Sequence, residues 1–210
     1  MQLLMVGGHS RSVGKTALVE DLIRAFPEAG WTAIKITQYG HDLGATSGKG
    51  CECAPREGLA PACTALDEEF DRGGRTGTSR FLAAGARRVL WLRTRQGALA
   101  QSMPLLLHEM RRAGNVILES NSLVEFLDPT LYLVCLEPER TDFKSLALHF
   151  LGRADAFVLR SPLGSQAWPD VPLDQIERKP RFVQRLGAPL PAGLLSLVAA
   201  RFTLPSEQAA

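Results

Sequence analysis

The stretch MVGGHSRSVGKTALVEDL, residues 5–22, decides the fold that we expect for this chain. Gly14, Lys15 and Thr16 have the order found at the end of a phosphate-binding loop. The usual spacing of that loop is G-x-x-x-x-G-K-[ST], but five residues, not four, separate Gly8 from Gly14 here. The stretch is therefore either a phosphate loop with one extra residue or an ordinary turn that contains Gly-Lys-Thr by coincidence.

The sequence on both sides of the loop favours phosphate binding. Residues 2–6, QLLMV, form a short apolar run that is typical of a buried strand. Residues 16–26, TALVEDLIRAF, place apolar side chains on one face of a helix and acidic side chains off it. A strand, a glycine-rich turn and a helix bring backbone N–H groups and the positive end of the helix dipole to one point, where phosphate binds. We therefore expect Lys15 to reach the terminal phosphates and the Thr16 hydroxyl to hold Mg²⁺.

Three segments resemble known families. The loop with five intervening residues resembles that of dethiobiotin synthetase, and IKITQYG, which contains Lys35, looks like the second-strand segment of that family. TSRFLAAGARRVLWL, residues 78–92, resembles a segment of the GTP-binding accessory proteins of molybdopterin-guanine dinucleotide biosynthesis. Both families belong to one branch of phosphate-loop NTPases with a parallel sheet. The resemblance covers about residues 1–136, with a gap at 42–73.

The resemblance implies that the extra residue is a family trait and that the loop binds ATP or GTP. The guanine signature N-K-x-D is absent from the sequence, so the identity of the base stays open. Arg160 and Ser161 follow the sixth expected strand, where such proteins hold the base, and we expect them to line the base site. The residues expected to bind the phosphates are Gly8, Arg11, Ser12, Val13, Gly14, Lys15 and Thr16.

The whole sequence predicts an α/β fold with a doubly wound, mostly parallel sheet, the phosphate-loop NTPase fold. Strand-like and helix-like segments alternate, as parallel strands require, because each pair needs a crossover connection. We expect a single domain over residues 1–210, with a loop insertion rich in cysteine, glycine and proline at about residues 42–73. The expected strands are Gln2–Val6, Thr32–Thr37, Val89–Leu92, Asn115–Leu118, Leu131–Leu136 and Ala156–Leu159. The expected helices are Thr16–Phe26, Thr78–Ala84, Ala98–Arg112, Asp142–Gly152 and Pro191–Ala200.

Composition argues against several classes of protein. The 210 residues are 45% hydrophobic, which suffices for one sizeable core. With 24 basic and 22 acidic side chains the net charge is +2, so no strong field attracts nucleic acid or a membrane surface. The basic stretch ERKPRFVQR, residues 177–185, is better interpreted as a solvated face than as a nucleic-acid patch. Four cysteines, with no secretory signal and no membrane span, indicate a cytoplasmic protein.

Carboxylates at the ends of strands are candidates for the Mg²⁺ site. Glu119 ends the apolar run NVILE, at a position that is acidic in the branch that the chain resembles. A surface glutamate is the alternative, but beside the loop we favour a carboxylate that meets Mg²⁺ directly or through water. Asp42 is the candidate for a second such carboxylate. Dethiobiotin synthetase follows this glutamate with a glycine-rich turn, whereas this chain reads ESNSLVEF, residues 119–126, which argues against biotin chemistry.

Three cationic side chains are candidates for contacts with the phosphates or with a substrate. Arg80 matches a residue of the cofactor-accessory family, and Arg11 lies inside the loop. Lys35 ends a strand and can bind a substrate carboxylate or phosphate. For Arg11 and Lys35 the alternative is a side chain in solvent. The residues that we expect to be catalytic are Lys15, Lys35, Arg80 and Glu119.

The segment HDLGATSGKGCECAPREGLAPAC, residues 41–63, matches neither family. Three thiolates and one imidazole are a sufficient tetrahedral set for Zn²⁺, and thiolates also hold iron–sulfur clusters. The C-x-C spacing differs from the usual C-x2-C of a zinc knuckle, so thiols without a metal are the alternative. The candidate ligands are His41, Cys51, Cys53 and Cys63. Cys135 lies in an apolar strand and is expected in the core.

Three functions fit these observations. The first is an accessory protein that hydrolyses ATP or GTP during cofactor or metalloenzyme maturation, with a protein of that pathway as partner and a homodimer as a further option. The second is an ATP-dependent ligase or kinase that acts on a carboxylate near Lys35, and the third is a nucleotide-gated binding module. We favour the first, because TSRFLAAGA is the more extended match and the residues after Glu119 depart from the ligase.

Overall fold

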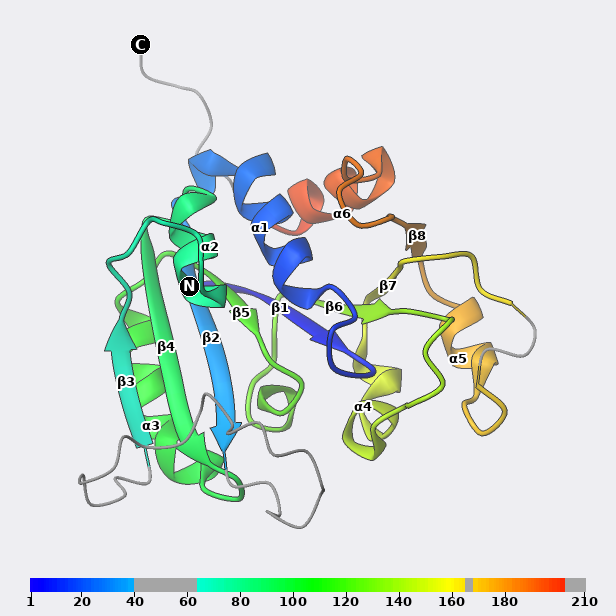
Figure 1. The fold of residues 1–210 in the computed structure, drawn as a ribbon, viewed down its shortest axis with the longest axis horizontal. Helices are drawn as coiled ribbons and strands as arrows, with labels where there is room; N and C mark the ends of the chain where they lie inside the picture. Colours follow the sequence, from blue (N-terminus) through cyan, green and yellow to red (C-terminus); the bar gives the residue numbers. More distant parts are fainter. Residues whose placement is uncertain (40–63, 165–167, 203–210) are drawn as a thin grey trace.

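The strands of the protein form one sheet in the computed structural model of the chain, which describes residues 1–39, 64–164 and 168–202 (Figure 1). The strands are β1 (Gln2–Gly8), β2 (Thr32–Tyr39), β3 (Thr64–Glu68), β4 (Arg88–Arg95), β5 (Asn115–Glu119), β6 (Leu131–Leu136), β7 (Ala156–Leu159) and β8 (Arg181–Val183). Within the described residues their order is β3-β4-β2-β5-β1-β6-β7-β8. All neighbouring pairs are parallel except β3 and β4, which are antiparallel.

Helices cover both faces of the sheet (Figure 1). One face packs against α1 (Lys15–Ala25), α2 (Gly77–Ala83) and α6 (Ala192–Arg201). The other packs against α3 (Leu99–Arg111), α4 (Ser145–His149) and α5 (Leu173–Glu177). Short 3₁₀ turns are η1 (Pro27–Ala29), η2 (Leu123–Glu125) and η3 (Leu151–Arg153). In the part of the chain that the structure describes, every helix is too short or too polar to cross a membrane.

The central strand β1 is buried on both faces, which explains its unbroken apolar run. Successive side chains of a strand point to opposite faces. Leu4 and Val6 therefore join the core under α1, while Leu3 and Met5 join the core under α3. A strand covered by helices on both sides needs apolar residues at every position, not at alternate ones.

The course of the chain opens a crevice at the end of β1. From β1 the chain crosses to β2 on one side, and from β5 it crosses over to β6 on the other side of β1. Ligands of doubly wound sheets bind at the carboxyl ends of the strands where the direction of winding reverses. The turn from Gly8 to Lys15 and the end of β5 at Glu119 both lie at this point.

The expected α/β class and the mostly parallel sheet are confirmed. Every expected strand and helix is present at nearly its expected position, but β3, β8 and α5 were not expected. Strand β3 shows that the proposed insertion at 42–73 is not loop throughout. Its five residues, TALDE, contain only two apolar side chains, so they lack the pattern of a buried strand.

The expected helix Asp142–Gly152 is too long at both ends, since α4 runs only from Ser145 to His149 and the 3₁₀ turn η3 follows from Leu151. The backbone of Lys144 is extended, with φ −70° and ψ 135°. The Lys144 N–H donates to the His9 carbonyl, and the Asp142 carbonyl is 3.0 Å from the His9 ring. The second contact uses the Asp142 carbonyl, which a helix beginning at Asp142 would need as an acceptor, and the first holds Lys144 in its extended conformation against the turn after β1.

Candidate functional site

The turn between β1 and α1, residues 9–14, is called the β1–α1 loop below. Two of its residues have positive φ, Ser12 at 57° and Gly14 at 85°. Gly14 is also the N-cap of α1, and its carbonyl accepts the first helical hydrogen bond from the Leu18 N–H at 3.0 Å. The loop therefore delivers the chain into α1 with the N–H groups of the first helical turn free of intrahelical partners.

Both glycines of the Gly8-x5-Gly14 pattern are required by close approach. A Cβ atom at Gly14 would lie 2.5 Å from Nε of Arg160, and one at Gly8 would lie 2.6 Å from the side chain of Val13. A Cβ atom at such a distance would force the Arg160 or Val13 side chain to shift, and the positive φ of Gly14 disfavours other residues independently. The spacing of the glycines is thus a packing requirement of this loop.

Lys15 curls back over the loop that precedes it. Its Nζ atom donates to the Ser10 carbonyl at 2.9 Å. Burial lowers the pKa of Lys15 from its ordinary value, while the nearby Glu119 carboxylate opposes that shift. An ammonium group in this position can contact an anion held over the loop without a change in the backbone.

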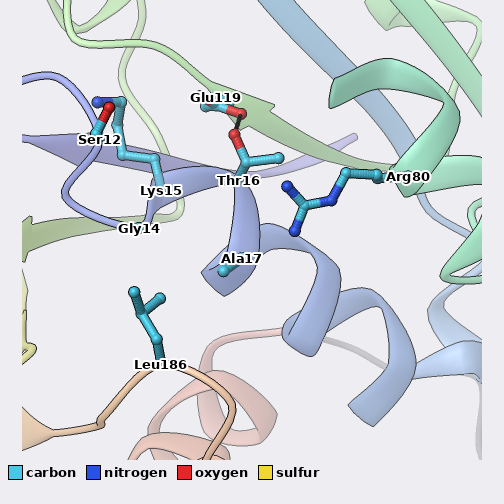
Figure 2. A pocket seen from close by; sticks show the side chains of 8 residues that line it. All are labelled: Ser12, Gly14, Lys15, Thr16, Ala17, Arg80, Glu119 and Leu186. Atoms are coloured by element: carbon cyan, nitrogen blue, oxygen red, sulfur yellow. Dashed lines mark hydrogen bonds between the residues drawn. The ribbon is translucent and has the colours of Figure 1, made fainter. Parts of the chain in front are cut away.

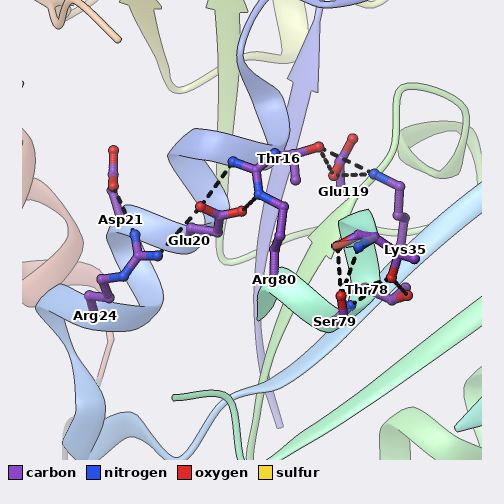
Figure 3. Close-up of polar contacts among 10 residues, drawn as sticks. Thr16, Glu20, Asp21, Arg24, Lys35, Thr78, Ser79, Arg80 and Glu119 are labelled. Carbon is purple, nitrogen blue, oxygen red and sulfur yellow. Dashed lines mark hydrogen bonds and ion pairs between the residues drawn. The ribbon is translucent and has the colours of Figure 1, made fainter. Parts of the chain in front are cut away.

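Thr16, Lys35 and Glu119 form a cluster beside the loop (Figure 3). Parallel register places Lys35 of β2 opposite Glu119 of β5, and Glu119 opposite Val6 of β1. Oε2 of Glu119 accepts from the Thr16 hydroxyl at 2.8 Å and from Nζ of Lys35 at 2.9 Å, and Nζ lies 3.2 Å from Oγ1 of Thr16. Glu119 is only 9% exposed. A carboxylate and a hydroxyl oxygen therefore converge on one cation position.

A pocket of about 360 Å³ opens between the loop and the first turn of α1. Its lining residues are Ser12, Gly14, Lys15, Thr16, Ala17, Arg80, Glu119 and Leu186. Figure 2 shows the Arg80 guanidinium directed from α2 toward Thr16 and Ala17, with Leu186 on the opposite side. The structure thus brings six of the predicted site residues to a single pocket: Ser12, Gly14, Lys15, Thr16, Arg80 and Glu119.

Arg80 is paired with a glutamate that the sequence did not single out. Nη2 of Arg80 donates to Oε2 of Glu20 at 3.1 Å, and Nε pairs with Oε1 of the same carboxylate. Glu20 lies one helical turn after Thr16, and it also pairs with Arg24 at 3.5 Å. This pairing ties α2 to α1 and keeps the guanidinium at the edge of the pocket (Figure 3). The sequence signal for Glu20 is its position four residues after Thr16, which places the two side chains on the same face of the helix.

Asn121 holds the start of the loop from the segment after Glu119. Its Oδ1 atom accepts from the Gly8 N–H and its Nδ2 atom donates to the Gly8 carbonyl, both at 2.7 Å. Ser120 turns the backbone toward this contact, since its hydroxyl accepts from the Ser122 and Leu123 N–H groups. Residues 119–122, ESNS, therefore hold the β1–α1 loop in place. This is the segment that departs from the glycine-rich turn of the dethiobiotin synthetase pattern.

His9 fixes the loop from the other side. Its Nε2 atom accepts from the Glu137 N–H at 3.1 Å, so Nδ1 carries the proton and donates to the Asp142 carbonyl at 3.0 Å. The ring packs against Phe143 and Trp168, with centroid distances of 5.0 and 4.9 Å. Burial lowers the pKa of His9 to about 4, because the buried ring is held neutral. His9, which stands where the usual spacing would place the first glycine, is therefore a buried anchor of the loop.

The remaining predicted residues do not line the pocket. Arg160 is 5% exposed and lies beneath the loop, and the Ser161 hydroxyl donates to Glu137 at 3.3 Å. Arg11 is exposed and forms no ion pair within the described residues. Cys135 is fully buried, as expected, and burial raises its pKa to about 11.

The proposed zinc or iron–sulfur ligands and the second Mg²⁺ carboxylate lie outside the described residues. They are His41, Asp42, Cys51, Cys53 and Cys63. Within residues 1–39, 64–164 and 168–202, no group of three or more His, Cys, Asp or Glu side chains is arranged to hold a metal. The thiolate hypothesis is therefore unchanged by the structure.

In comparisons with known proteins, the chain matches no protein-family model, no curated protein and no solved structure. Its function is therefore inferred from the residues of the site.

We expect His9 to make stability depend on pH. Because the folded pKa of about 4 lies below the ordinary 6.5, the unfolded chain takes up the proton first, and stability falls as pH decreases from 6.5 to 4. The loss amounts to about 3 kcal/mol. His9→Gln can keep both hydrogen bonds without titrating, so its urea-unfolding free energy should change less over this range. The exposed His108→Gln variant should behave like the parent. Equal pH dependence of the parent and His9→Gln would contradict this assignment.

Proposed function

We propose that the chain is a phosphate-loop NTPase that binds ATP or GTP with Mg²⁺ and hydrolyses it. The observation that carries the proposal is the convergence of Lys15, the N-terminus of α1 and the Thr16–Glu119 pair on one pocket. Each element alone is common, but together they place a cation, backbone donors and a pair of oxygens suited to a metal around the first turn of α1. This combination matches the needs of a nucleoside triphosphate.

The triphosphate binds along the β1–α1 loop. The N–H groups at the start of α1 have no intrahelical partners, and the dipole of this 11-residue helix favours negative charge at its N-terminus. The Lys15 ammonium group then donates to phosphate oxygens and no longer to the Ser10 carbonyl. These oxygens supply the negative charge that a buried ammonium group needs beside it. The loop thereby binds the phosphates by backbone and side chain together.

Thr16 and Glu119 are the residues that would hold Mg²⁺. The donor set is suitable, since Mg²⁺ prefers oxygen ligands and is usually held by one or two carboxylates plus substrate phosphates. The ammonium group of Lys35 already lies between these two oxygens, which supports their affinity for a cation. A metal ion bound there supplies charge stabilisation for the phosphoryl group that is transferred.

Lys35 and Arg80 stabilise negative charge at the reacting end of the triphosphate. Lys35 would give up its contacts with Thr16 and Glu119 to a metal held there, and its ammonium group would then be free to bind a phosphate. Arg80 borders the pocket while it stays paired with Glu20. Preorganised cations at such positions lower the energy of a charged transition state.

We assign the base side of the pocket to Leu186 and not to Arg160 and Ser161. Leu186 is 60% exposed and borders the pocket from the segment between β8 and α6. An apolar side chain at a pocket rim provides a surface for the flat face of a base. The assignment leaves ATP and GTP as equal candidates.

We infer that hydrolysis serves an accessory role, with a protein partner, in cofactor or metalloenzyme maturation. The resemblance of residues 78–92 to the molybdopterin-guanine dinucleotide accessory family supports this role. The contact of Asn121 with Gly8 also supports it, because the segment after Glu119 is committed to holding the loop and not to a small-molecule pocket. Phosphate release measured with candidate small molecules and with co-purifying proteins distinguishes this role from a ligase.

Lys15→Ala should lower the affinity for ATP or GTP by about 10- to 100-fold. A charge-assisted hydrogen bond contributes about 1.5–3 kcal/mol, and alanine is compatible with the first turn of a helix. Titration calorimetry with each nucleotide in the presence of Mg²⁺ measures the effect. Arg87→Ala, which removes an exposed cation at the opposite end of the sheet, is the control and should bind like the parent. Unchanged affinity of Lys15→Ala would remove the phosphate-loop proposal.

Glu119→Gln should slow Mg²⁺-dependent phosphate release by about 100-fold or more, while nucleotide affinity falls much less. The amide keeps the size of the side chain and can still accept from Thr16, but it lacks the charge that a metal ligand needs. Phosphate release is measured over a range of Mg²⁺ concentrations. The exposed Glu125→Gln variant, on η2, is the matched control. If Glu119→Gln releases phosphate at the parental rate, Glu119 is structural.

A further inference from the structure

Arg160 lies beneath the β1–α1 loop and contacts two of its carbonyl oxygens. It follows β7 directly, and its own N–H donates to the Leu136 carbonyl of β6 at 2.9 Å. Nε donates to the Val13 carbonyl at 3.2 Å, and Nη2 donates to the Gly14 carbonyl at 2.6 Å. The planar guanidinium group thus holds two successive peptide groups of the loop at once.

These two contacts fix the direction of two N–H groups. In a trans peptide, the C=O and N–H bonds are held in one plane and point in opposite directions. Because the Val13 and Gly14 carbonyls point down to Arg160, the N–H groups of Gly14 and Lys15 point away from it. Gly14 and Lys15 line the pocket, and neither N–H has a hydrogen-bond partner within the described residues. Both N–H groups are therefore available to an anion in the pocket.

The charge of Arg160 is compensated by no carboxylate among the described residues. Its remaining side-chain contacts are with Gln184, whose carbonyl and Oε1 atoms accept from Nη1 at 3.2 and 2.7 Å, and with Sγ of Cys135, which accepts from Nη2 at 3.9 Å. Neutral oxygens satisfy the hydrogen bonds of a guanidinium but not its charge. A buried cation directly below the loop raises the electrostatic potential above it, which favours an anion there.

Through Gln184, the same guanidinium group also holds the other side of the pocket. Nε2 of Gln184 donates to the Ala188 carbonyl at 3.2 Å and to Oδ2 of Asp21 on α1 at 2.9 Å. The segment between Gln184 and Ala188 carries Leu186, which borders the pocket. One side chain therefore supports both the phosphate side and the proposed base side.

We propose that Arg160 is a positioning residue for the triphosphate: it orients the Gly14 and Lys15 N–H groups toward the phosphates and adds positive charge beneath them, without touching the nucleotide. The inference rests on the proposed function, since it needs an anion in the pocket. The close approach to Gly14, where a Cβ atom would meet Nε at 2.5 Å, requires glycine at the position above this guanidinium.

The test uses inorganic tripolyphosphate, which carries the charge of the nucleotide without its base, and the variants Arg160→Met and Arg160→Lys. Arg160→Met should lower tripolyphosphate affinity at least tenfold in titration calorimetry. Arg160→Lys should lose at least threefold, because one ammonium group keeps the charge but cannot hold both carbonyls in the fork geometry. Arg181→Met, at an exposed position of the edge strand β8, removes the same charge and should bind like the parent.

An amide signature separates positioning from general stability. In ¹⁵N-labelled parent protein, tripolyphosphate should shift the Gly14 and Lys15 amide resonances, and in folded Arg160→Met or Arg160→Lys these shifts should be clearly reduced. If Arg160→Met does not fold, Arg160→Lys decides by the same two measurements. If a folded Arg160 variant shows the parental affinity and the parental amide shifts, the role of Arg160 is overturned while the proposed function stands. A parent that binds neither tripolyphosphate nor nucleotide overturns the proposed function first.

Discussion

A Cβ atom at Gly14 would lie 2.5 Å from the guanidinium of Arg160, and one at Gly8 would lie 2.6 Å from the side chain of Val13. The turn between β1 and α1 packs this closely against Arg160 and Val13 because both positions have no side chain, and the positive φ of Gly14 suits glycine. The tight turn in turn sets the position of Lys15 and Thr16 at the start of α1, next to the end of β5. The pocket and the cluster of Thr16, Lys35 and Glu119 therefore both adjoin a turn that contains these two glycines.

Charge in the site is divided between groups that have partners and groups that lack them. Lys35 and Arg80 each have a carboxylate partner, in Glu119 and Glu20. Lys15 and Arg160 form no ion pair within the described residues, and both contact carbonyl oxygens of the loop or its surroundings. A triphosphate would give Lys15 and Arg160 the anionic neighbour that they lack, which is the electrostatic reason for the affinity that we propose.

The sequence was sufficient for six strands of the sheet and for part of the site. Apolar runs identified the buried strands, and a carboxylate at the end of one of them, Glu119, lies beside the Thr16 hydroxyl as expected. Sequence could not reveal contacts between distant segments, such as Asn121 with Gly8 or Arg160 with Val13. The sequence did not predict strand β3, because an edge strand buries few of its side chains and therefore needs no apolar pattern.

His9 has a consequence beyond the β1–α1 loop itself. His9 exchanges hydrogen bonds with Glu137 and Asp142, its carbonyl accepts from Lys144, and its ring fills the space beside Phe143 and Trp168. Loss of His9 would therefore expose the rings of Phe143 and Trp168. It would also leave the Glu137 N–H group, which lies far from His9 in the sequence, without its acceptor. The β1–α1 loop and the connection after β6 are thus coupled by packing, even though only one of them borders the pocket.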